Sequence, residues 1–97
     1  QPGSISLKNS SNDSLIFINI YPNPVENIFS VEFELNKETD ISLELKDIYG
    51  NLILSFPNKI FVGSYRKQVN LSNFAAGTYI LKIKIGSSFY YTKLLLI

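Results

Sequence analysis

Alternation of apolar and polar side chains is the feature that most restricts the fold of this chain. Residues 28–35 show it best, with apolar residues at every second position and polar residues between them (Phe29, Val31, Phe33 and Leu35 against Ser30, Glu32 and Glu34). Successive side chains of a β-strand point to opposite faces, so this segment is expected to bury one face and expose the other. An amphipathic helix would need a period near 3.6 residues, which no stretch displays convincingly.

The same alternation recurs clearly in residues 41–47 and 79–85, and more weakly in residues 15–20, 52–56 and 65–71. In the 79–85 segment the inward face begins with Tyr79, whose ring we expect in the core rather than in a ligand platform. Residues 89–97 are apolar on both faces at their end, which leaves their facing open. Short strands at such regular spacing are typical of a sandwich. We therefore predict an all-β fold, an antiparallel immunoglobulin-like β-sandwich of about seven strands in two sheets.

Turn-forming residues separate these segments. Asp47 and Gly50 predict a hairpin turn, because the aspartate can accept a backbone hydrogen bond and glycine tolerates positive φ. Gly86 predicts a second tight turn. Gly77, at the entrance to the strand expected over residues 79–85, is expected to supply a positive φ or a close backbone approach. The polar residues 36–40 predict a third turn, and residues 58–64 predict a longer loop.

Proline marks further expected strand ends, because it has no N–H to give to a sheet. Pro22 and Pro24 flank Asn23 directly after the first apolar segment and predict a stiff corner there. Pro57 is expected to close the strand that ends at Phe56.

Composition argues against most enzyme chemistry. The 97-residue chain has no cysteine and no histidine, which removes disulfides, cysteine nucleophiles, the commonest general base and the commonest metal ligand. Nine basic residues against eight acidic ones give a net charge of +1, which supplies no electrostatic reason to bind nucleic acid. We therefore expect no catalytic residue, no metal site, no cofactor and no nucleic-acid partner.

The chain is expected to hold one domain. Residues 1–14 are mostly small and polar, and we interpret them as a linker with a cloning scar at its start. Residues 15–97 carry the strand pattern and form the predicted domain. Because methionine is absent, we expect the chain to be a piece of a longer precursor.

Four blocks of the sequence resemble, in order, the motifs of the type A C-terminal sorting domains of the type IX secretion system. They are Tyr21-Pro22-Asn23-Pro24-Val25, Asp47-Ile48-Tyr49-Gly50, residues 71–79 with their Gly77-Thr78-Tyr79 end, and Lys93-Leu94-Leu95-Leu96-Ile97. Together with Gly86 in its turn, these blocks give the residues of the family motif (Tyr21, Pro22, Asn23, Pro24, Asp47, Gly50, Gly77, Tyr79 and Gly86). The resemblance covers residues 18–97.

The resemblance implies a non-catalytic export signal. Such a domain folds as a sandwich in the periplasm and directs an attached upstream cargo protein through the type IX outer-membrane translocon. A surface sortase then removes it, and the cargo stays at the outer-membrane surface or is secreted. The expected partners are therefore translocon and sortase components, with cleavage in the polar stretch 4–14.

Recognition by the translocon is assigned to the terminal residues Lys93, Leu94, Leu95, Leu96 and Ile97. We hypothesise that this terminal strand lies at a sheet edge and offers unpaired backbone groups for strand addition. For Lys93, the alternatives are a receptor contact, snorkelling of its ammonium to water and protection of an exposed edge. The same apolar end leaves open a weak homodimer formed through edge strands.

Two other functions share the predicted fold. One is an immunoglobulin-like spacer or adhesion domain, which would have no reason to carry the four blocks. The other is a carbohydrate-binding module using exposed tyrosines, although the chain has no tryptophan.

Overall fold

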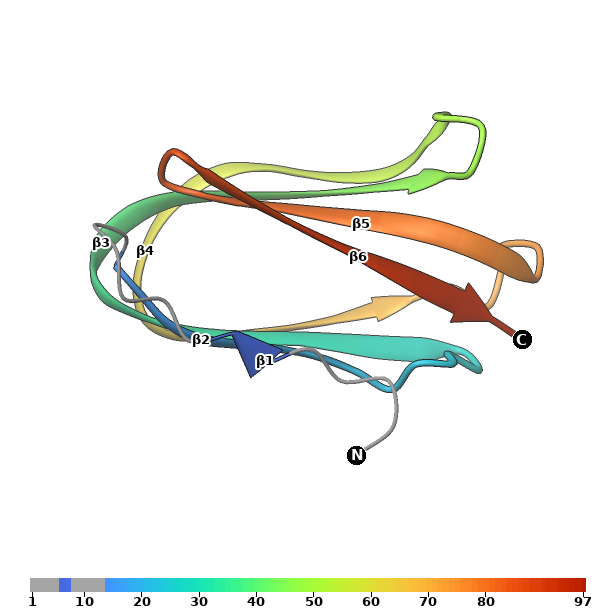
Figure 1. Ribbon diagram of the computed structural model, residues 1–97, viewed down its shortest axis with the longest axis horizontal. Coiled ribbons are helices and arrows are strands. Elements are labelled where there is room, and N and C mark those ends of the chain that lie inside the picture. Colours follow the sequence, from blue (N-terminus) through green and yellow to red (C-terminus); the bar gives the residue numbers. More distant parts are fainter. Residues whose placement is uncertain (1–5, 8–13) are drawn as a thin grey trace.

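The computed structural model describes residues 6–7 and 14–97. This part of the chain forms six β-strands in chain order: β1 (Ser6–Leu7), β2 (Leu15–Tyr21), β3 (Ile28–Asp47), β4 (Leu52–Asn70), β5 (Gly77–Ile85) and β6 (Ser88–Leu96) (Figure 1). Within the described ranges there is no helix able to cross a membrane.

The strands form two layers that belong to one hydrogen-bonded sheet. Every pair of neighbouring strands is antiparallel, in the order β1-β2-β3-β5-β6, with β4 on the other side of β3. The long strands β3 and β4 bend together and run from one layer into the other (Figure 1). The first layer holds β1, β2, residues 28–35 of β3 and residues 63–70 of β4. The second layer holds residues 39–47 of β3, residues 52–61 of β4, β5 and β6. The predicted all-β antiparallel sandwich is thus confirmed, except that its two layers are parts of one bent sheet and not two separate sheets.

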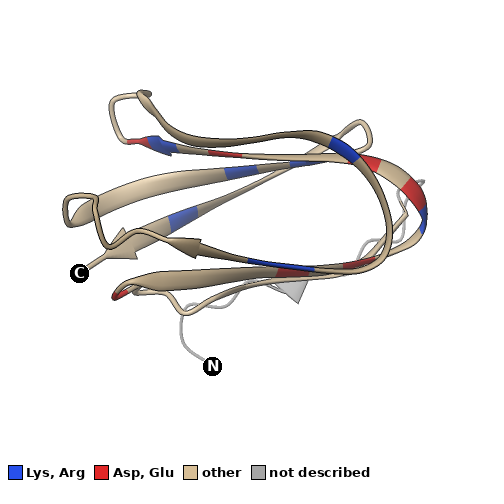
Figure 2. Ribbon diagram, turned by 180° about the vertical axis from the view of Figure 1, so that it is seen from behind, with Lys and Arg blue, Asp and Glu red and all other residues tan. Residues whose placement is uncertain are grey.

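The bend corrects two predicted connections, because residues 36–40 lie inside β3 and residues 58–64 lie inside β4. The register passes from Leu35↔Gly63 to Thr39↔Phe61, so β3 has two more residues than β4 at this point. Such bulges curve a strand without ending it. Residues 36–40 are polar because they lie on the convex side of the bend, where they are largely exposed and charged residues gather (Figure 2). Four predicted strands are therefore joined into two.

Pro57 also lies within a strand, so the expectation that it closes one is wrong. Of the described strands, only β3 pairs with β4 in the second layer, so a residue there can lack an N–H without losing a sheet hydrogen bond. The register passes from Leu43↔Phe56 to Ile41↔Lys59, which gives β4 one extra residue around Pro57.

Most of the predicted 1–14 linker lies outside the described residues. Ser6 and Leu7 form β1, which pairs with Asn19 and Ile18 of β2. Ser14 is buried, and its hydroxyl is hydrogen-bonded to that of Thr39 in the bend of β3. The start of the domain at residue 15 stays a prediction.

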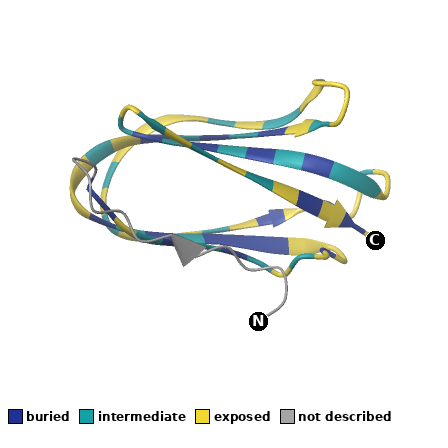
Figure 3. Ribbon diagram, viewed as in Figure 1, coloured by how far each residue is buried: buried dark blue, intermediate teal, exposed yellow. Residues whose placement is uncertain are grey.

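The core lies between the two layers, and buried positions alternate with more exposed ones along the strands (Figure 3). Each residue predicted to face inward from the three clearest segments is buried (Phe29, Val31, Phe33, Leu35, Ile41, Leu43, Leu45, Tyr79, Leu81, Ile83 and Ile85). Ser30 differs from its predicted exposure, because it is covered between Tyr21 of β2 and Gln68 of β4. The facing of residues 89–97, which the sequence left open, is now defined, because Leu94 and Leu96 face the core.

The predicted Asp47 turn is confirmed. One carboxylate oxygen of Asp47 accepts hydrogen bonds from the backbone N–H groups of Tyr49 and Asn51, both at 2.9 Å. The other accepts one from the Asn51 side-chain amide at 3.0 Å. Gly50 has φ 87°, which disfavours other residues. The hydrogen bond from the Asn51 side chain, with those from backbone N–H groups, holds the pKa of Asp47 below its ordinary value of 3.8.

Replacing Asp47 by alanine should destabilise the domain in a pH-dependent way. A lowered carboxyl pKa contributes stability that is present above the ordinary value of 3.8 and is lost as the pH falls through the lowered one. Thermal melting of both proteins should therefore show a Tm difference that is full at neutral pH and narrows in acid below 3.8. A Tm difference that stays constant across this range would show that the charged carboxylate does not hold the turn.

Candidate functional site

The candidate site is the outer edge and outer face of β6. On one side β6 pairs with β5, from Ile85↔Ser88 to Gly77↔Leu96, without a register shift. On its other side no strand of the described part follows β6. The odd-numbered side chains of β6 and its end are exposed on the outer face (Phe89, Tyr91, Lys93, Leu95 and Ile97).

The side chain of Asn23 pairs with the backbone of β6 near its end. Its Nδ2 donates a hydrogen bond to the Lys93 carbonyl at 2.7 Å. Its Oδ1 accepts one from the Leu95 N–H at 3.0 Å. A carboxamide has the same donor and acceptor groups as a peptide unit. Asn23 therefore occupies the edge as a neighbouring strand would.

Val25 continues this pairing to the last residue. Its N–H donates to the Leu95 carbonyl at 2.7 Å, and its carbonyl accepts from the Ile97 N–H at 2.9 Å. The Val25 side chain is fully buried, so the contact is also an apolar one. We call residues 21–25 the closing segment, because it covers the edge of β6 from the Lys93 carbonyl to the Ile97 N–H.

The sequence of the closing segment suits this role. Pro22 and Pro24 lack N–H groups, and β2 ends at Tyr21, as predicted. Both peptide bonds that precede these prolines are cis. Because the prolines bring no N–H of their own to the edge, the Asn23 side chain and Val25 supply the groups that pair with β6.

The start of the closing segment is held to the first layer. The Tyr21 hydroxyl donates a hydrogen bond to the Glu32 carboxylate, which also forms an ion pair with Arg66 at 3.2 Å. This hydrogen bond raises the pKa of Tyr21 above its ordinary value of 10.0. The segment thus runs from an anchored residue on the first layer to the edge of the second.

The structure brings all four sequence blocks to one end of the second layer. Asp47 of β3 lies opposite Tyr79 of β5, and Tyr79 lies opposite Leu94 of β6. Val25 then bridges to Leu96. Gly86 is the exception among the motif residues, because it lies in the β5–β6 turn at the other end of these strands.

Tyr79 and Gly77 have structural roles in this arrangement. Tyr79 is buried, as predicted, and its hydroxyl donates a hydrogen bond to the Ala75 carbonyl. Bonds from a tyrosine back to a preceding corner are a recurring feature of β-sandwiches. Gly77 has φ 148°, so the predicted positive φ is confirmed. The alternative of a close backbone approach is not, because a Cβ at Gly77 would meet no atom within 4 Å.

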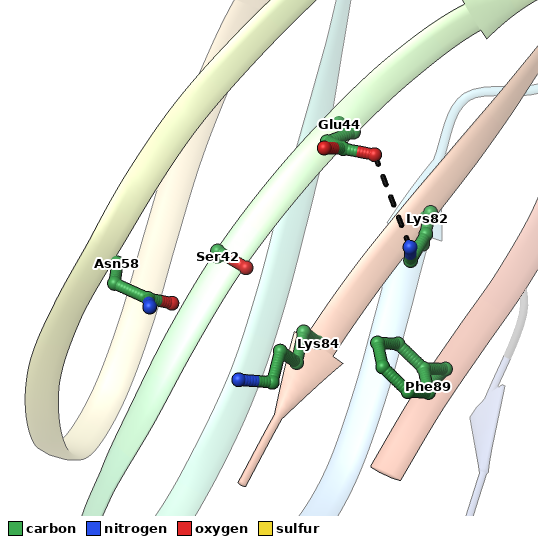
Figure 4. Close-up of a pocket in the computed structure, with 6 residues that line it drawn as sticks. All are labelled: Ser42, Glu44, Asn58, Lys82, Lys84 and Phe89. Carbon is green, nitrogen blue, oxygen red and sulfur yellow. Dashed lines mark ion pairs between the residues drawn. The ribbon is translucent and has the colours of Figure 1, made fainter. Parts of the chain in front are cut away.

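The outer face beside β6 is basic and partly apolar. A shallow hollow of about 160 Å³ lies over all four strands of this layer and is lined by Ser42, Glu44, Asn58, Lys82, Lys84 and Phe89 (Figure 4). Glu44 pairs with Lys82 at 3.9 Å, and the Lys82 ammonium lies 4.8 Å from the centre of the Phe89 ring. Lys93 is exposed on β6. Among residues 6–7 and 14–97, no group of three acidic side chains could hold a metal ion.

The partner of Asn23 is the feature that sequence reasoning missed. The pattern indicated a corner at Pro22 and Pro24 but gave no reason to pair Asn23 with residues about 70 positions later in the chain. An asparagine held between two prolines was the available signal, because its carboxamide is the side chain best able to replace the missing backbone groups.

Replacing Asn23 by alanine should detach the end of β6 without unfolding the domain. Loss of two hydrogen bonds should lower the free energy of unfolding by about 1–3 kcal/mol. In hydrogen–deuterium exchange, the Leu95 amide should exchange faster, while core amides of β5 keep their protection.

Asn70→Ala is the matched control, because the Asn70 side chain makes a comparable bond to the Ser72 N–H at 2.9 Å. This control should leave exchange at Leu95 unchanged. Equal exchange at Leu95 in the wild type and Asn23→Ala would contradict the assigned pairing.

The family comparison agrees with this geometry. A model of the secretion system C-terminal sorting domain matches residues 19–97, which include all four blocks and both partners of the closing contact. No curated protein matches the chain. Members of this family act as type IX secretion sorting signals, are generally non-catalytic and are continuous with a cargo protein, and their signal implies passage through the periplasm to the cell surface or beyond. The chain belongs to the family of type IX secretion C-terminal sorting domains.

Proposed function

We propose that this domain is a passive, non-catalytic export tag for an upstream cargo protein. It directs the cargo through the type IX outer-membrane translocon. A surface sortase then removes the domain by cleaving the chain in the polar stretch 4–14. The cargo is left at the outer-membrane surface or released. The family match over residues 19–97 carries this proposal.

The translocon contacts are proposed to be the outward residues of the terminal stretch. Lys93, Leu95 and Ile97 are exposed, with 44% of Leu95 and 63% of Ile97 accessible to solvent. Leu94 and Leu96 face the core and are 0% and 3% exposed. They therefore act through folding, because burial of apolar side chains stabilises the strand on its sheet. The sequence assigned both residues to recognition, and we propose that the translocon does not contact them and that they support recognition only by keeping β6 folded.

The exposed positions favour this proposal over a carbohydrate-binding module. Tyr49 and Tyr91 are the exposed tyrosines among the described residues, and they lie in the β3–β4 turn and on β6. Tyr65 stacks on Phe33 with ring centres 4.5 Å apart and is partly buried. A sugar platform needs rings gathered on one surface, and this placement does not provide it.

The proposal is tested by fusing residues 1–97 behind a periplasmic reporter, in a host that carries the type IX system. The unmodified domain should bring the reporter to the cell surface or the medium. Lys93→Glu should reduce export severalfold at an unchanged Tm, because it reverses the charge of an exposed side chain without disturbing the core.

Lys37→Glu makes the same charge change in the exposed bend of β3 and should leave export unchanged. A reporter that stays in the cell with the unmodified domain would refute the sorting function. Normal export of Lys93→Glu would remove Lys93 from the recognition surface.

A further inference from the structure

The closing segment covers only half of the outer edge of β6. Its hydrogen bonds reach the Lys93 carbonyl and stop there. Backbone groups of alternate residues point to the same side of a strand. Because the N–H and C=O of Leu95 face the closing segment, those of Tyr91 and Phe89 and the Lys93 N–H face the same edge. No described residue pairs with these five groups.

The other sheet edges of the described chain carry protection that this stretch lacks. The edge of β2 is partly paired with β1. The second-layer edge of β4 holds Pro57 and a bulge, and its first-layer edge carries Arg66 and Lys67. Proline, bulges and charges are the usual means of preventing unwanted strand pairing. Residues 89–93 have no proline and no register shift, and Lys93 is their single charge.

The side chains on this stretch are also exposed and apolar. Phe89 is 48% and Tyr91 is 62% accessible to solvent. An open edge beside exposed aromatic rings suits strand addition, in which backbone bonds give affinity and side chains give selectivity.

We propose that residues 89–93 of β6 bind an extended segment of the export machinery as an added strand. The closing segment sets the end of this site, because Asn23 already occupies the Lys93 carbonyl and the Leu95 N–H. The added strand is therefore short, about 16 Å at the usual rise per residue. This inference rests on the proposed sorting function and names the part of the domain that the machinery pairs with.

The charges beside the edge define the partner chemistry. Lys93 lies at the end of the open stretch, and Lys82 and Lys84 lie on the neighbouring strand β5. Glu44 is the carboxylate that lines the adjacent hollow, and it is already paired with Lys82 (Figure 4). The partner strand thus places a carboxylate side chain beside Lys93 and apolar or aromatic side chains beside Tyr91 and Phe89.

The backbone contribution is tested by comparing Tyr91→Pro with Tyr91→Val in the full-chain reporter fusion. The Tyr91 N–H faces away from β5, so proline removes an edge donor without removing a β5 hydrogen bond. Valine also removes the ring but keeps the N–H and suits a strand. Export should fall about tenfold further for proline than for valine, the equivalent of roughly 1.4 kcal/mol of binding.

Hydrogen–deuterium exchange gives a second readout that does not depend on the variants. In the free domain the amides of Phe89, Tyr91 and Lys93 should exchange fast, while that of Leu95 is slow. Adding purified translocon components should protect the first three and leave Leu95 as it was.

Each contrary result has a distinct meaning. Equal export of the two Tyr91 variants at equal Tm, or no added protection at residues 89–93 on binding, would overturn the inference. Protection of these amides in the free domain would also overturn it. If that protection increased with protein concentration, it would identify a second copy of the chain as the occupant. In all these cases the unmodified domain still exports its reporter, whereas failure of the sorting function abolishes that export.

Discussion

The contact between the closing segment and the end of β6 completes the sandwich. On one side the two layers are joined covalently, because β3 and β4 bend from the first layer into the second. On the other side the first layer reaches the second through Asn23 and Val25, which make three hydrogen bonds to β6 and one to Ile97 directly after it. Without them the terminal strand would pair with β5 alone. One side of the molecule is thus held by continuous strands, and the other by the pairing of segments that lie far apart in the sequence.

This closure explains why the family blocks are scattered along the chain. Asp47, Tyr79 and Leu94 lie in a row across three strands, and the closing segment borders the last of them. The blocks therefore describe one end of the second layer, whose turn, core tyrosine and terminal strand form a single packed unit. Strand β6 keeps its conformation only when the domain is folded, because Leu94 and Leu96 must pack into the core.

The sequence predicted the facing of residues well and the connections only in part, because the Asp47 and Gly86 turns exist but residues 36–40 and 58–64 lie inside strands. Alternation places a side chain on one face whatever follows the strand, so the inward residues of β3 and β5 could be identified. A polar stretch is expected both in a turn and on the outside of a bend, so residues 36–40 could not be assigned from composition. A proline interrupts a central strand but is tolerated in an edge strand. The outcome at Pro57 therefore depended on strand order, which the alternation pattern does not reveal. The pairing of Asn23 has no periodic signature, because a single side chain makes it across the whole domain.

The closed edge of β6 depends most directly on the hydrogen bond between the Asn23 side chain and the Lys93 carbonyl. Solution NMR of the full chain can detect it as a coupling through the hydrogen bond, from the Asn23 side-chain nitrogen to the Lys93 carbonyl carbon. We expect this coupling together with slow exchange of the Asn23 side-chain amide protons. An Asn23 side chain without the coupling, exchanging as fast as one in an unfolded peptide, would contradict the closed edge.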